Sequence, residues 1–234
     1  MVDKVLILGS KPKSKIPKIE VSKIYTANGA AYKVEEYKKY FKDISHTCII
    51  GADHFLGNND VKKKVENSEI DELIIRGKRK IKVDSFRSKP SILYLNNLDQ
   101  LKIQSKVFNN SFFNLIYGET KYEINIISKI IHFMRCVKKR KIQAVSTGFF
   151  SIIYASLMNP NSELIISGIG MQEDHNLYNK KEEGFVKRAR VDNFLVKKLD
   201  KKFKEKILTT DTLLASYAGF KLWEWIFYLK IYDK

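Results

Sequence analysis

One stretch of the chain, residues 144–170, constrains the fold more than any other. It reads AVSTGFFSIIYASLMNPNSELIISGIG: a turn of small residues, an apolar helix, and a short β-rich run that ends in glycine. Ser146 or Thr147 can cap this helix, and Gly148 lets a ligand approach the backbone. Because the start of a helix attracts anions, the stretch predicts half of an α/β unit with a phosphate or nucleotide site. The plainer alternative is an ordinary capped helix followed by a strand.

The beginning of the chain carries a second turn of this kind. Lys4–Leu8, KVLIL, has the pattern of a buried strand and runs directly into Gly9, Ser10 and Lys11. Nucleotide-binding α/β domains commonly start with a strand followed by such a loop. The chain contains neither GxGxxG nor GxxxxGK[ST], so no motif supports a dinucleotide-binding domain or a P-loop ATPase.

Segments with strand and helix patterns alternate along the chain. We expect strands at Lys4–Leu8, Lys23–Thr26, Thr47–Gly51, Glu72–Ile75, Ser91–Leu95, Lys141–Val145, Glu163–Ser167 and Lys206–Thr209. We expect helices at Val34–Phe41, Tyr122–Arg140, Phe149–Met158 and Val191–Lys204. This alternation predicts a single Rossmann-like α/β domain, with a mostly parallel sheet flanked by helices and a small lid as an addition. Leu95–Phe113, rich in Asn, Gln and Lys, is expected to be a loop or insertion.

The expected sheet also places the expected site. Ligands of such sheets bind beyond the carboxyl ends of the strands. The turns at those ends should therefore converge on one cleft, and they hold Gly9, Asn28, Gly51, Ser146 and Gly168.

An aromatic segment, residues 212–234, follows the α/β domain expected over residues 1–211. It contains Trp223 and Trp225 among several tyrosines and phenylalanines, and a helix here would be apolar nearly all round. Such a helix suits a membrane interface. The alternative is a helix packed on the core or on a second subunit, which leaves a homo-oligomer open.

Charge and cysteine content bound the partners and the compartment. The formal net charge is +17, which favours anionic partners such as nucleotides, nucleic acid or an acidic membrane. The alternative is that the lysines only solvate helix faces. Cys48 and Cys136 lack the spacing of a zinc site or a disulfide framework, and no run reaches the ~20 apolar residues of a membrane span. We expect a cytoplasmic protein, peripheral at the inner face of the membrane if the aromatic segment binds there.

Three segments together resemble the sialyltransferases: VLILGSKPKS, IYTANGAAY and VSTGFFSIIYASLMNPNSELIISGIGMQ. That family has a strand before a G-(N/S)-x-P-S loop, an asparagine after the second strand, and an (S/T)-(S/T)-G turn before a helix and a strand. The resemblance implies a metal-independent inverting glycosyltransferase without a cofactor. Its donor would be sialic acid, or a related ulosonic acid such as Kdo, activated by CMP, and its acceptor a glycan or a lipid-linked sugar.

We expect the donor nucleotide to be held by residues in and beside the turns. These are Gly9, Ser10, Lys11, Asn28, Asp53, Ser146, Thr147, Gly148, Ser167, Gly168 and Tyr178. No DxD dyad is present to hold a divalent cation against a diphosphate, so no metal is expected.

The catalytic residues are harder to place, because the family has a histidine four or five residues before an aspartate. Before Asp192 this chain instead has the basic residues Lys187, Arg188 and Arg190. His175, in a polar loop beyond a strand end, is therefore our candidate for the general base, with Asp174 or Asp192 as a carboxylate substitute. Arg188 and its neighbours could bind the donor phosphate or carboxylate. The alternatives are an exposed loop histidine and a solvated basic helix face.

A second hypothesis belongs to another class of protein: a non-enzymatic basic module that binds RNA or an anionic membrane surface through its lysines. RNA-binding surfaces interleave aromatic with basic residues, whereas the aromatic residues here cluster in apolar runs and near the C-terminus. We therefore expect no nucleic-acid partner.

Overall fold

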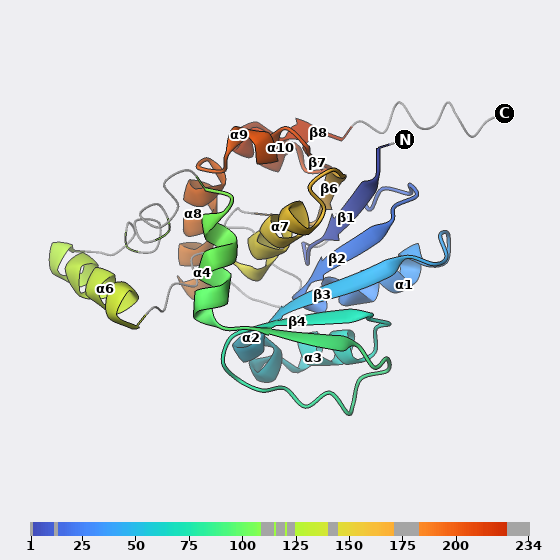
Figure 1. Ribbon diagram of the computed structural model, residues 1–234, viewed down its shortest axis with the longest axis horizontal. Helices are drawn as coiled ribbons and strands as arrows, with labels where there is room; N and C mark the ends of the chain where they lie inside the picture. Colours follow the sequence, from blue (N-terminus) through green and yellow to red (C-terminus); the bar gives the residue numbers. More distant parts are fainter. Residues whose placement is uncertain are drawn as a thin grey trace.

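The computed structural model describes residues 2–11, 14–108, 115, 120, 125–139, 145–170 and 183–223, with only the backbone at 136–139 and 183–188. In these ranges eight strands form one sheet in which every neighbouring pair is parallel, and helices cover both faces (Figure 1). The predicted Rossmann-like α/β fold is therefore confirmed.

The strands of the sheet are β1 (Lys4–Leu8), β2 (Lys23–Ala27), β3 (Ser45–Gly51), β4 (Glu72–Arg76), β5 (Ser91–Leu95), β6 (Glu163–Ser167), β7 (Ile207–Thr209) and β8 (Lys221–Leu222). The helices are η1 (Asn28–Tyr32), α1 (Lys33–Tyr37), α2 (Ala52–Gly57), α3 (Asn59–Glu66), α4 (Asn97–Ser105), α6 (Ile126–Lys139), α7 (Thr147–Met158), α8 (Glu183–Val196), α9 (Lys201–Lys204) and α10 (Thr212–Ala218).

The strand order reverses direction at one point of the sheet. The order is β5-β4-β3-β2-β1-β6-β7-β8, so the chain builds outward from β1 to one edge and then returns to build from β6 to the other. Val5 of β1 is in register with Lys23 of β2 on one side and with Leu164 of β6 on the other. Crevices for ligands form at such reversals, because the connections on either side lead away from each other.

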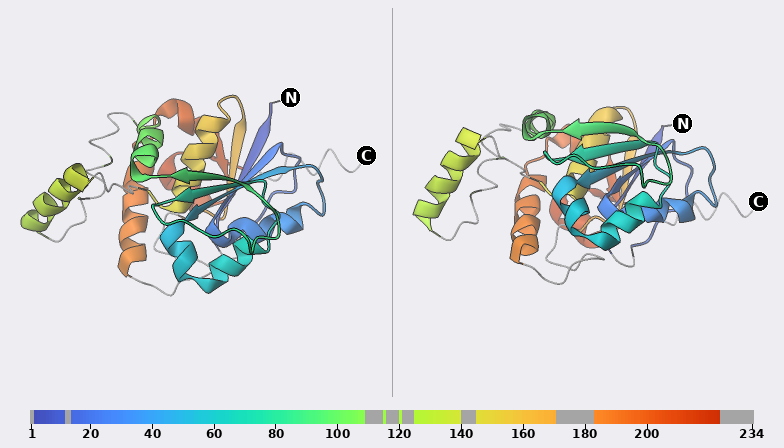
Figure 2. Two further views of the ribbon diagram at one scale, coloured as in Figure 1. Left: turned by 60° about the horizontal axis from the view of Figure 1, so that its bottom comes forward. Right: turned by 90° about the horizontal axis from the view of Figure 1, so that it is seen from below.

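The residues of β1 show how the two layers of helices are held. Val5 and Ile7 belong to the hydrophobic cluster that includes α7, whereas Leu6 and Leu8 belong to the cluster that includes α1. This alternation follows the two-residue period of a strand. Figure 2 shows α7 on one side of the sheet and α2 and α3 on the other. Residues Phe149–Ser156 of α7 are all buried, so this helix is sandwiched rather than lying on the surface.

The turns after β1 and β6 touch each other through two glycines. The N–H of Gly9 donates to the carbonyl of Ser167 at 2.8 Å, and the N–H of Lys11 donates to the carbonyl of Gly168 at 2.8 Å. A Cβ on Gly9 would collide with the carbonyl oxygen of Gly168. Gly168 has a φ of +71°, and a Cβ there would lie 2.7 Å from the hydroxyl oxygen of Ser14. Both positions therefore require glycine.

The buried side chain of Lys33 forms hydrogen bonds with the loop after β1. The Nζ of Lys33 donates to the carbonyls of Gly9 at 2.7 Å and Lys11 at 3.2 Å, and to the hydroxyl of Ser14 at 2.8 Å. These acceptors are neutral, and burial lowers the pKa of Lys33 to about 8. Lys33 and Gly168 thus both hold the beginning of this loop.

One predicted loop is a helix. Leu95–Phe113 was expected to be a loop or insertion, but α4 begins right after Asn96, whose side chain accepts hydrogen bonds from the N–H groups of Leu98 and Asp99. The carboxylate of Asp99 accepts in return from the N–H of Asn96 at 3.1 Å. The prediction was wrong because the polar composition concealed a capping box.

The C-terminal third differs from the prediction in two places. The single helix expected at Val191–Lys204 is two helices, since α8 ends at Val196 and Asp200 caps α9. The aromatic segment begins with α10, which ends at Ala218 with Gly219 as its C-cap, and β8 then pairs with β7. Phe220 and Trp223 are buried, while residues 224–234 and most of the expected strand 141–145 lie outside the described residues. No helix of the described chain is long and apolar enough to cross a membrane.

Substitution of Gly9 by alanine tests the contact between the two turns. We expect Gly9→Ala to lower the free energy of unfolding by about 1–3 kcal/mol or more, because the added methyl group displaces the Gly168 backbone. Urea unfolding followed by tryptophan fluorescence measures the change. Gly57→Ala is the matched control, since a Cβ at Gly57 meets nothing within 4 Å. Equal stability of the two variants would contradict the close contact.

Titration of Lys33 gives a second prediction. Its folded pKa of about 8 lies below the ordinary 10.5, so between these values the unfolded chain binds a proton that the folded chain does not. The contribution of Lys33 to the free energy of unfolding should therefore rise as the pH rises from 8 to 10.5. Urea unfolding of the wild type and of Lys33→Met across this range measures it as the difference between the two curves. A stability difference between the two proteins that does not change with pH would contradict the lowered pKa of Lys33.

Candidate functional site

A cavity of about 400 Å³ opens at the carboxyl ends of the strands around the reversal point. Its walls come from the segments after β1, β2, β3 and β6 and from the last residue of β4, together with the start of α7 and one side of α8. A volume of this size falls in the range of small-molecule sites. The turns thus converge on one cleft, as expected from the sequence.

Most of the residues predicted to hold a ligand line this cavity. From the turns after the strands it receives Gly9, Ser10, Asn28, Asp53 and Gly168. From the start of α7 and from α8 it receives Ser146, Thr147, Gly148 and Asp192. Residues up to 183 positions apart in the sequence, from Gly9 to Asp192, are therefore brought to one place by the sheet.

The start of α7 presents hydrogen-bond donors to the cavity. Ser146 is the cap, and its side chain accepts from the N–H of Phe149 at 3.2 Å. The N–H groups of Thr147 and Gly148, in the first turn, have no acceptor inside the helix. Both residues line the cavity, so an anion there would meet these two N–H groups, the Thr147 hydroxyl and the positive end of the helix dipole.

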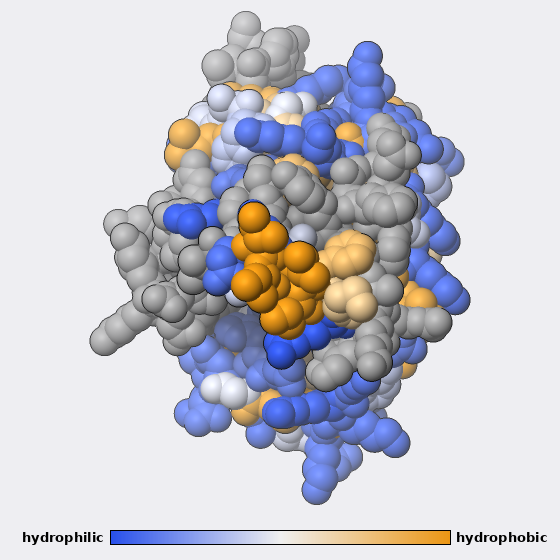
Figure 3. Space-filling view, turned by 90° about the vertical axis from the view of Figure 1, so that its left-hand side faces the viewer, coloured by the Kyte–Doolittle hydropathy of each residue, from blue (hydrophilic) through white to orange (hydrophobic). Residues whose placement is uncertain are grey.

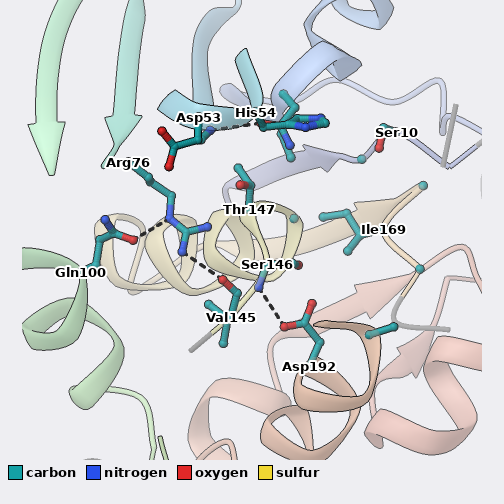
Figure 4. Close-up of a pocket in the computed structure, with 18 of the residues that line it drawn as sticks. Ser10, Asp53, His54, Arg76, Gln100, Val145, Ser146, Thr147, Ile169 and Asp192 are labelled. Atoms are coloured by element: carbon teal, nitrogen blue, oxygen red, sulfur yellow. Dashed lines mark hydrogen bonds between the residues drawn. The ribbon is translucent and has the colours of Figure 1, made fainter. Parts of the chain in front are cut away.

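Two charged side chains form hydrogen bonds with the peptide unit that precedes α7. Nη2 of Arg76 donates to the carbonyl of Val145 at 3.0 Å, and the N–H of Ser146 donates to Oδ1 of Asp192 at 2.9 Å. This carbonyl and this N–H belong to the same peptide unit, and Figure 4 shows the two side chains approaching it from different sides. The orientation of the first turn of α7 is therefore held by a cation and an anion. Asp192, predicted as a catalytic carboxylate, positions the turn in addition to lining the cavity.

Arg76 was not predicted as a site residue. It ends β4 and is 7% exposed, with its guanidinium carbon 4.2 Å from the centre of the Phe150 ring. Its Nε donates to Oε1 of Gln100 at 3.0 Å, and Gln100 in turn donates to the carbonyl of Leu95. The signal for Arg76 was present, because it follows the predicted strand at Glu72–Ile75 just as Gly9 follows β1. Gln100 was missed because α4 was taken for a loop.

Asn28 ties the ends of β2 and β3 together. It has a φ of 51°, a left-handed conformation that asparagine tolerates better than most residues. Its Oδ1 accepts from the N–H of Gly51 at 3.2 Å. A Cβ on Gly51 would lie 3.5 Å from Oγ1 of Thr147, so the end of β3 faces the start of α7 across a narrow gap.

Two of the predicted residues do not line the cavity. The Nζ of Lys11 forms an ion pair with Asp211 at 2.7 Å. Burial alone would raise the pKa of Asp211, but the hydrogen bonds from Lys11 and from the first N–H groups of α10 lower it overall. The hydroxyl of Ser167 donates to the carbonyl of Lys15 at 2.7 Å. Lys11 and Ser167 therefore hold the turns in place.

Three further predictions cannot be placed on the cavity wall. His175 and Tyr178 lie outside the described residues, as does the side chain of Arg188, whose backbone belongs to α8. Among the described residues no group of three or more His, Cys, Asp and Glu side chains could hold a metal ion.

The cavity combines anion-binding groups with groups that can transfer protons. Donors to an anion come from the start of α7 and from the buried cation of Arg76. Proton transfer could involve the imidazole of His54 and the carboxylates of Asp53 and Asp192, all of which line the cavity. Asp53 also pairs with Arg79 at 3.0 Å near the surface.

The chain was compared with protein families, curated proteins and solved structures. No family model, no curated protein and no solved structure matches it.

Proposed function

We propose that this chain is a metal-independent inverting glycosyltransferase that moves an acidic sugar from a CMP-activated donor to a glycan or lipid-linked acceptor. The sugar would be sialic acid or a related ulosonic acid. The observation that carries the proposal is the convergence of the turns after β1, β2 and β6 with the start of α7 on one cavity. These are the segments in which the sequence resembles the sialyltransferases.

The geometry of the cavity supports an ester phosphate as the bound anion. The N–H groups of Thr147 and Gly148 and the Thr147 hydroxyl provide three neutral donors, and Arg76 provides a positive charge behind the same turn. Donors fixed before the ligand arrives stabilise charge that develops on a leaving group. A phosphate held here could leave as CMP without a metal ion to neutralise it.

The proposed reaction requires one base and one leaving group. The base removes the proton of an acceptor hydroxyl, whose oxygen forms a bond to the anomeric carbon of the sugar. The bond from that carbon to the phosphate oxygen breaks, and CMP leaves with the electron pair. In the described part of the cavity the proton could be taken by His54, Asp53 or Asp192. His175 remains a further candidate base from the sequence.

In this proposal the protein works in the cytoplasm, where CMP-activated sugars meet acceptors at the inner face of the membrane. The competing proposal is a non-enzymatic basic module, and the net charge of +17 is the observation that favours it. The two differ in what the cavity does. A transferase needs a selective nucleotide site, whereas a basic module binds anions in general and loses affinity steeply with salt.

Calorimetric titration with CMP, UMP and AMP at moderate salt, without divalent metal, tests the proposal. We expect CMP to bind selectively and Thr147→Trp to abolish binding, because the indole would fill the space between α7 and Gly51. Thr212→Trp is the matched control, since Thr212 is also the first residue of a helix but is exposed and outside the cavity. Equal binding of the three nucleotides, or none, would favour the basic module.

Replacement of Arg76 tests where the phosphate lies. We expect Arg76→Met to weaken CMP binding by about tenfold or more while leaving cytidine binding unchanged, since the positive charge that Arg76 places behind the first turn of α7 is lost. Arg87→Met is the control, because Arg87 is exposed and lies outside the cavity. Equal weakening of CMP and cytidine would mean that Arg76 supports the fold of the site and does not contact the phosphate.

A further inference from the structure

Helix α6 presents an apolar face to solvent. Figure 1 shows it outside α4 and α8, away from the sheet, and Figure 3 shows hydrophobic side chains gathered on the face viewed there. Ile126 and Ile127 are 73% and 70% exposed. The other large apolar side chains that are exposed on this helix are Ile130, Ile131, Phe133 and Met134. So many exposed apolar residues on one helix indicate a surface with a binding partner.

The apolar and polar residues of α6 occupy different sides. Successive residues of a helix are turned by about 100°, which puts the six exposed apolar residues on one continuous arc. Ser128 and His132 lie on the opposite side and are half-buried, in contrast to the exposed apolar arc. Lys129 and Arg135 are exposed and follow the arc directly, one at each border.

The charge of α6 indicates what covers the apolar face. Its sequence, IISKIIHFMRCVKK, contains four cationic residues and no acidic residue. A helix with an apolar face bordered by lysine and arginine is the pattern of segments that lie in the interface of a membrane, with the cations at the anionic head groups. At 14 residues the helix is about 21 Å long, too short to span the bilayer.

We infer that α6 binds the surface of an anionic membrane, with its apolar face inserted between the lipids and Lys129 and Arg135 at the head groups. A second copy of this chain fits less well. Two such faces packed together would bring cations of equal sign close to one another, in a protein whose net charge is already +17. An anionic lipid surface complements both the apolar arc and the charge. This inference does not depend on the proposed transferase activity.

Flotation with vesicles tests the inference on the full chain. The probes are vesicles of phosphatidylcholine alone and of phosphatidylcholine with phosphatidylglycerol at about 7:3. We expect the wild type to float with the anionic vesicles only, and Ile130→Asp to lower the bound fraction by about tenfold, because a carboxylate in the apolar arc must be buried among the lipids. Ser128→Asp is the matched control, since it changes the net charge equally on the opposite side and should bind as the wild type does.

Three results would overturn the inference. These are no binding to either vesicle, equal loss of binding in Ile130→Asp and Ser128→Asp, and a dimer in sedimentation velocity without lipid that Ile130→Asp dissociates. The last result would assign the face to a second copy. Circular dichroism and CMP titration of Ile130→Asp separate the membrane contact from the fold and from the cavity. Unchanged melting confirms that the variant is folded, and a CMP titration equal to that of the wild type confirms that the cavity is unaffected.

Discussion

The contact between Gly9 and Gly168 is the constraint on which the rest of the structure depends. β1 and β6 are neighbours at the point where the strand order reverses, so both turns leave the sheet side by side. A side chain on either glycine would push the turns apart, and the hydrogen bonds from Gly9 to Ser167 and from Lys11 to Gly168 would be lost. The backbone of Gly9 and Gly168 therefore lines the cavity, and a ligand meets peptide groups at these two positions.

The start of α7 is also held in place, by hydrogen bonds to two charged side chains. Eight consecutive residues of this helix are buried, which fixes its axis. The peptide unit between Val145 and Ser146 forms hydrogen bonds with Arg76 and Asp192. These two side chains come from β4 and α8, on different sides of the cavity. The donors of α7 are thus oriented before any ligand binds, and preorganisation of this kind is what electrostatic catalysis requires. A change at Arg76 or Asp192 can therefore alter the anion site by tilting the first turn.

The fold and most of the cavity could be predicted from the sequence because both follow from local patterns. Buried strands and the turns at their ends are marked by short runs of residue types, and the parallel sheet then brings the turns together. The predictions that were wrong or incomplete concerned features that depend on specific side-chain contacts. The capping box of Asn96 and Asp99 turned an apparent loop into α4, and with it Gln100 entered the site. Arg76 follows a predicted strand just as Gly9 follows β1, so its position at the ligand-binding edge of the sheet could be predicted. It was missed because arginine, unlike glycine, is not a residue typical of turns.

Apolar composition also did not tell which segment keeps its apolar residues exposed, because tertiary packing decides which of them are buried. The aromatic C-terminal segment was the candidate in the sequence. Its Phe220 and Trp223 are buried, and Trp223 belongs to the same hydrophobic cluster as Leu6 and Leu8 of β1, while residues 224–234 lie outside the described residues. The isoleucines of α6 are exposed, although their pattern predicts an ordinary amphipathic helix. Where a helix is covered by its own domain, its apolar side chains pack into the core. In α6 the polar residues Ser128 and His132 are half-buried while the apolar arc is exposed, so the arc is left for a partner outside the chain.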